Sequence, residues 1–134
     1  MKNATTAARM LVRVCGTIAL VLGLLFWLGE LRQLVPLHIV LGIIVVITMW
    51  FLSALGFRAG VTLALLVATF LWSLLLLDVG LMQNSLLTEP GDPHWLVQAL
   101  HLVIGMGGMA LTEVLAGRIV PTRASLGQAR SSGA

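Results

Sequence analysis

Charged residues are scarce in this sequence. Asp, Glu, Lys and Arg make up only 10% of its 134 residues, whereas hydrophobic residues make up 59%. A soluble domain carries about 25% charged residues, so this chain has too little polar surface for a water-soluble fold. A soluble enzyme and a nucleic-acid-binding domain are therefore excluded. The net charge of +3 is better explained by arginines that orient the chain in a membrane.

Cysteine is almost absent as well. The single residue, Cys15, lies in an apolar stretch and has no partner within the chain, which excludes a disulfide-stabilised secreted module. A second domain does not fit beside a set of membrane spans, because each span takes about 20 apolar residues. We therefore expect one domain that is integral to a membrane.

Apolar residues form four runs, each long enough to cross a bilayer. Glycines, prolines and charged residues separate the runs, and Gly56, Arg58 and Gly60 are expected to form a short turn. These features predict an all-α membrane protein, a bundle of four transmembrane helices in up-down-up-down order. We expect a four-span bundle in residues 1–120, with spans at about 10–28, 36–55, 60–77 and 95–120, and a disordered cytoplasmic tail at 121–134.

Basic residues are distributed unequally between the two sides of these spans. In the expected topology seven of the eight fall on one side, and Arg32 alone falls on the other. The side richer in Lys and Arg is normally cytoplasmic. Both termini are therefore expected in the cytoplasm, with the spans in a plasma (inner) membrane.

Two histidines begin similar segments that are 63 residues apart. Residues 38–42 and 101–105 both read His, aliphatic, Val, aliphatic, Gly, which suggests a duplicated helical hairpin. A histidine within a membrane span is energetically costly and by default marks a functional site. Since the second and fourth spans are diagonally opposed in such a bundle, His38 and His101 are expected at similar depth in its outer half.

Two inward imidazoles on diagonal helices can bind one metal ion from opposite sides, as the axial ligands of a heme iron do. We expect His38 and His101 to be these ligands, with heme b (iron protoporphyrin) as the cofactor. Gly42 and Gly105 follow each histidine by one helical turn, where the missing side chain would let the macrocycle approach. Gly108 extends this face of small residues along the fourth span.

Other residues near the expected site leave alternatives open. Arg32, six residues before His38, is placed to pair with heme propionates that point outward. His94 could bind metal or line a propionate, but its position directly after Pro93 favours an interfacial role. In a simpler interpretation the histidines hydrogen-bond to neighbouring helices and the glycines are packing positions. Zinc or copper is disfavoured because no cysteine or carboxylate joins the pair.

One carboxylate lies near the cytoplasmic end of the fourth span. Glu113 has Arg118 and the N-terminal arginines available as partners. We expect a structural ion pair there rather than a proton path.

A four-helix bundle with His38 and His101 on its second and fourth spans resembles half of heme A synthase. That family has two such bundles in one chain, each with a histidine pair that binds heme, and the resemblance implies heme binding at these two residues. The chain departs from the family in its first outer loop, where Glu30 stands eight residues before His38 and no cysteine pair is present. Oxidation of a heme methyl group is therefore not implied. A homodimer would recreate an eight-helix form.

The leading interpretation is a small membrane b-type cytochrome that transfers electrons between quinol and an outer-face redox partner. Its expected partners are the lipid bilayer, that redox pair and a second copy of the chain, but no nucleic acid. One alternative is a heme-handling or heme-modifying enzyme related to heme A synthase, which needs one weak or labile ligand. Another is a non-heme accessory or transport protein. An electron carrier or heme-bearing subunit is favoured over a catalyst.

Overall fold

The computed structural model describes residues 2–83, 85–86 and 92–120. Each of its four long helices is long and apolar enough to cross a membrane, so the all-helical class is confirmed. The expected tail at 121–134 and part of the loop before the fourth helix lie outside the described residues. The elements are α1 (Lys2–Trp27), the short 3-10 helix η1 (Arg32–Leu34), α2 (Val35–Arg58), α3 (Leu63–Met82) and α4 (His94–Ile119).

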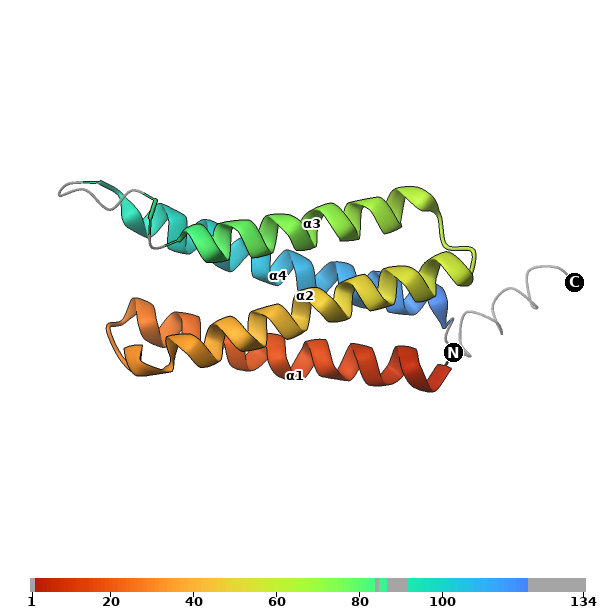
Figure 1. Ribbon diagram of the computed structural model, residues 1–134, viewed down its shortest axis with the longest axis horizontal. Coiled ribbons are helices and arrows are strands. Elements are labelled where there is room, and N and C mark those ends of the chain that lie inside the picture. Colours follow the sequence, from red (N-terminus) through yellow and green to blue (C-terminus); the bar gives the residue numbers. More distant parts are fainter. Residues whose placement is uncertain (1, 84, 87–91, 121–134) are drawn as a thin grey trace, which may run out of the picture.

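Each long helix runs back along the preceding one, as Figure 1 shows. Helix α4 also packs against α1, which closes a four-helix bundle, and α2 contacts α4 across its centre. One end of the bundle, marked by η1 and His94, is called the histidine end below. The other end, marked by Arg58 and Arg118, is called the arginine end.

Helices α1 and α2 end in the same way. The second residue after each helix is a glycine, Gly29 or Gly60. Their φ angles are 88° and 73°, a left-handed conformation that glycine adopts without a steric penalty. The N–H of each glycine donates to the carbonyl three residues earlier, and the next N–H donates to the carbonyl five residues earlier. This bond pair is the Schellman motif, which satisfies carbonyls left free at a helix C-terminus.

The helices extend beyond three of the predicted spans. Helix α1 begins at Lys2 rather than near residue 10, and α3 continues to Met82, so that Asp78 lies within it. Gly56 and Arg58 were expected in a turn but lie in the last turn of α2, which ends at Arg58. The turn between α2 and α3 follows them. Hydropathy locates the apolar part of each helix, but backbone hydrogen bonding continues into its polar ends.

The arginine half of the bundle is tightly packed. Leu52 and Leu115 are fully buried, and they form a core cluster with Ala8, Leu66 and Ile119. Most of the outer surface of the helices is also apolar, as expected of helices surrounded by lipid. The buried side chains therefore hold the helices together through close packing rather than through a difference in hydrophobicity between inside and outside.

An ion cluster joins α1 to α4 in the same half. The Nε of Arg13 donates to Oε1 of Glu113 over 2.6 Å, and its Nη2 donates to Oε2 over 2.9 Å. The Nε of Arg9 donates to the same Oε2 over 2.6 Å, and its Nη2 also pairs with this oxygen. The predicted ion pair is confirmed, with the N-terminal arginines as the partners.

Candidate functional site

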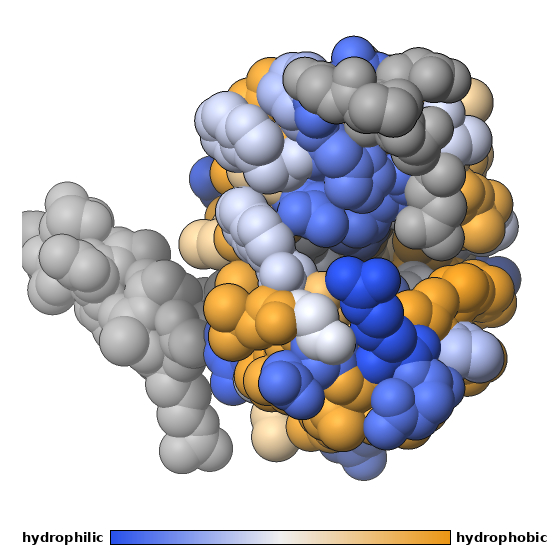
Figure 2. All heavy atoms as spheres, turned by 90° about the vertical axis from the view of Figure 1, so that its left-hand side faces the viewer, coloured by the Kyte–Doolittle hydropathy of each residue, from blue (hydrophilic) through white to orange (hydrophobic). Residues whose placement is uncertain are grey.

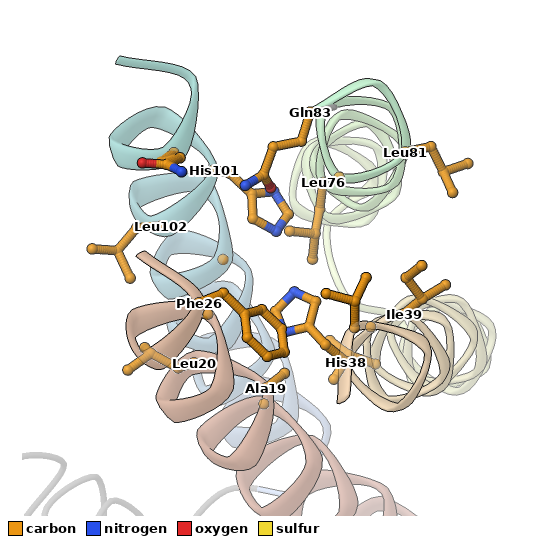
Figure 3. Close-up of a pocket in the computed structure, with 18 of the residues that line it drawn as sticks. Ala19, Leu20, Phe26, His38, Ile39, Leu76, Leu81, Gln83, His101 and Leu102 are labelled. Carbon is orange, nitrogen blue, oxygen red and sulfur yellow. The ribbon is translucent and has the colours of Figure 1, made fainter. Parts of the chain in front are cut away.

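The histidine half of the bundle contains a cavity of about 420 Å³. All four helices line it, and the volume falls in the range of about 300–1,000 Å³ that is usual for small-molecule and cofactor sites. Its lining is mostly aliphatic, with a few polar groups, as Figure 3 shows. A space of this size is large enough to hold a small molecule or a cofactor.

His38 and His101 point toward each other across this cavity (Figure 3). His38 comes from the first turn of α2 and His101 from the second turn of α4, and their ring centres are 6.1 Å apart with an angle of 56° between the planes. A metal–imidazole bond is about 2 Å long, and a ring nitrogen lies about 1 Å from the ring centre, so two imidazoles on opposite sides of one metal ion have centres about 6 Å apart. The observed separation matches this value.

The Nδ1 atoms of both histidines are buried and have no hydrogen-bond partner in the part of the chain that the structure describes. The backbone of Ala19 on α1 lies within hydrogen-bonding reach of the His38 ring, although Nδ1 itself has no partner among the described residues. An unpaired buried polar group costs about 1–3 kcal/mol, so two of them on residues that line one cavity are typical of a binding site. The simpler interpretation, in which a histidine hydrogen-bonds to a neighbouring helix, is consistent with the contact between His38 and Ala19 but leaves both Nδ1 atoms without a partner among the described residues.

Two of the three predicted glycines border the cavity. A Cβ atom built on Gly42 would have no neighbour within 4 Å, and one on Gly105 would only reach Leu76 Cδ1 at 4.0 Å. Both positions therefore leave open space beside the histidines. Gly108 does not line this space, because it is buried and a Cβ there would contact Met49 at 3.6 Å. It lies two helical turns beyond His101, while the lining of the cavity continues along α4 to Met109.

Sequence reasoning missed two further glycines, which lie behind the imidazoles. A Cβ on Gly80 of α3 would come within 3.0 Å of Cε1 of His101, and one on Gly23 of α1 would come within 3.4 Å of Cε1 of His38. In each hairpin a glycine thus accommodates the ring presented by the next helix. The sequence carries a weak signal for this role, since both glycines interrupt apolar helices.

Phe26 is a third contact that the sequence did not reveal. Its ring meets the His38 ring edge to face, with centres 5.5 Å apart and planes at 66°. Such a pair favours one ring orientation. Phe26 therefore helps to keep the imidazole of His38 directed into the cavity.

Polar side chains line the cavity where it reaches the histidine end. They are Arg32, Gln83, His94 and Gln98, and Figure 2 shows hydrophilic side chains across the centre of this end, between apolar flanks. Arg32 thus reaches the same cavity as the histidine pair, as its predicted role requires. The Nδ1 of His94 lies 3.0 Å from the carbonyl oxygen of Leu86, which holds this histidine at the end of the bundle.

No three His, Cys, Asp or Glu side chains gather around one point in the part of the chain that the structure describes. Two imidazoles are too few to enclose a metal ion by themselves, but they suffice where a macrocycle supplies the remaining ligands. No protein-family model, curated protein or solved structure matches this chain.

Proposed function

We propose that this protein is a membrane b-type cytochrome that binds one heme between His38 and His101. The observation that carries this proposal is the pair of facing imidazoles, 6.1 Å apart in a cavity, with both Nδ1 atoms buried and unpaired. When bound, the heme supplies a one-electron redox couple at the iron. The protein then serves as an electron carrier or a heme-bearing subunit.

The residues around the cavity have distinct roles in this proposal. His38 and His101 would hold the heme iron, and the open positions at Gly42 and Gly105 would give the macrocycle room beside the helix backbones. The exposed guanidinium of Arg32, at the polar end of the cavity, pairs with the propionates. Two imidazole ligands leave no open coordination position at the iron, which favours electron transfer over binding of a substrate.

The same proposal places the bundle in a plasma membrane in up-down-up-down order. The arginine end faces the cytoplasm together with both termini, because it carries most of the basic residues, and the histidine end faces outward. A reporter fused after Ala134 should be cytoplasmic, and one inserted near Glu89 should be external. An external reporter at Ala134 would contradict this topology.

An absorption spectrum of the purified protein tests the heme. The wild type should be red, with a sharp α band after reduction, and should not bind carbon monoxide. His38→Ala or His101→Ala should either open a coordination position, giving a high-spin spectrum that responds to carbon monoxide, or release the heme. The matched control His94→Ala should keep the wild-type spectrum. A colourless wild type, or unchanged low-spin spectra in both single variants, would overturn the proposal.

The same measurements separate the alternative functions. Carbon monoxide binding to the wild type would indicate a labile ligand and hence a heme-handling or heme-modifying enzyme, as the resemblance to heme A synthase allows. A colourless protein that is correctly inserted would indicate a non-heme accessory or transport protein.

A further inference from the structure

We propose that the cavity communicates only with the histidine end of the bundle, so that the bound cofactor exchanges electrons only with carriers on that side of the membrane. This inference rests on the proposed heme and extends it to the class of partner. The electron donor and acceptor are then a lipid-soluble hydroquinone in the outer leaflet or a soluble carrier outside, and not a cytoplasmic dehydrogenase.

The first argument is the depth of the two histidines. With a rise of about 1.5 Å per residue, His38 lies about 5 Å from the first residue of α2 but about 30 Å from its last residue, Arg58. His101 lies about 10 Å from the start of α4 and about 27 Å from its end at Ile119. The imidazole pair is therefore far closer to the histidine end than to the arginine end.

The second argument is the closed floor of the cavity. The deepest residues of its lining are Gly16, Val46 and Met109, and no member of the arginine half's core cluster lines it. Further along the bundle, Met49 and Leu115 are fully buried. The packed core of the arginine half therefore lies between the lining of the cavity and the arginine end.

The third argument is that the chain contains no second histidine pair through which an electron could pass from the proposed heme to the cytoplasm. The sequence contains three histidines, and the third, His94, lies at the histidine end beside Arg32, where both line the mouth of the cavity. A relay to the cytoplasm through another bis-histidine heme is therefore absent from this chain. The polar mouth is instead accessible to water-soluble carriers on its own side.

Cysteine labelling tests the one-sided cavity without relying on heme. In a His38→Ala/His101→Ala chain with Cys15→Ala, Gly105→Cys places a thiol in the cavity, where the structure has room for a Cβ. A membrane-impermeant maleimide should label it in right-side-out vesicles and at least ten-fold more slowly in inside-out vesicles. Gln33→Cys and Ala59→Cys, at exposed positions of the two ends, are the controls for each orientation. Labelling from the cytoplasmic side, or from neither side, would overturn the one-sided cavity.

Ferricyanide tests the electron exchange in vesicles that contain the reduced wild type. Each ferrous heme passes one electron to one ferricyanide ion, which becomes ferrocyanide, and no proton moves. Ferricyanide should bleach the reduced α band at least ten-fold faster when added outside right-side-out vesicles than when added outside inside-out vesicles. Equal rates would overturn the one-sided exchange. Vesicles without a heme band would instead contradict the proposed cytochrome, while the labelling result would still decide whether the cavity is one-sided.

Discussion

The two halves of this bundle are built from the same four helices but are packed in different ways. The histidine half encloses a cavity of about 420 Å³ with two unpaired imidazole nitrogens. The arginine half buries Leu52 and Leu115 completely and joins α1 to α4 through Glu113. Both halves are apolar, so the difference between them comes from how side chains meet across helices rather than from composition.

Glycine alone does not explain the cavity, because glycines occur in both halves. A Cβ on Gly56 would come within 2.8 Å of Leu66, and one on Gly16 would come within 2.7 Å of the sulfur of Met109. Large side chains from neighbouring helices thus fill these positions. At Gly42 and Gly105 no comparable side chain arrives. The space beside the histidines therefore exists because no side chain from a neighbouring helix fills it.

The largest effect is expected in the histidine half, from removing both imidazoles. His38→Ala/His101→Ala should abolish heme binding, because both imidazoles proposed to hold the iron are removed, while insertion should persist because it depends on the apolar runs. The heme content per protein and the membrane fraction are the measurements. Retention of heme by the double variant would show that other residues hold it.

The second-largest effect is a loss of stability in the arginine half, where removing a buried side chain would create a new cavity. Leu115→Ala removes a fully buried side chain and should lower the free energy of unfolding by about 2–5 kcal/mol, measured by denaturant titration in detergent micelles. The heme spectrum at low denaturant should be unchanged. A changed spectrum with unchanged stability would mean that the two halves are coupled.

Filling the cavity should have an intermediate effect. Gly42→Leu and Gly105→Leu would place side chains into the space beside the histidines, and we expect heme occupancy to fall several-fold. Gly117→Leu is a matched control, because a Cβ at Gly117 also has no neighbour within 4 Å but lies outside the cavity lining. Equal heme occupancy in all three variants would show that the macrocycle does not approach these backbones.

Neutralising the ion cluster should have a smaller effect. Glu113→Gln removes the charge that Arg9 and Arg13 share, and partly exposed ion pairs contribute up to about 1 kcal/mol. Denaturant titration should therefore show a modest loss of stability with an unchanged heme spectrum, and Glu30→Gln at an exposed position is the control. A loss of heme would show that the cluster acts on the cavity.

The smallest effect is expected behind the two imidazoles. Gly80→Ala should shift the low-spin spectrum slightly, because its Cβ would lie only 3.0 Å from the His101 ring. Gly23→Ala should shift the spectrum less, because its Cβ would lie 3.4 Å from the His38 ring. Electron paramagnetic resonance of the oxidised protein reports the ring orientations, with Gly117→Ala as the control. A larger shift from Gly23→Ala than from Gly80→Ala would contradict the ring positions.

Sequence by itself determined the parts of this protein that depend on local composition. Four long apolar helices follow from four apolar runs, and the repeated histidine and glycine spacing was sufficient to select His38 and His101 as the candidate pair. Hydropathy and helical periodicity are properties of one segment at a time, so they can be read without knowing the neighbours.

Only the tertiary structure decided the contacts between helices. It brought Gly23 and Gly80 behind the imidazoles, moved Gly108 out of the cavity lining, and selected Arg9 and Arg13 as the partners of Glu113. These contacts depend on the register and rotation of each helix against the others. Register is set by the close packing of side chains from several segments at once, and no single segment of the sequence contains that information.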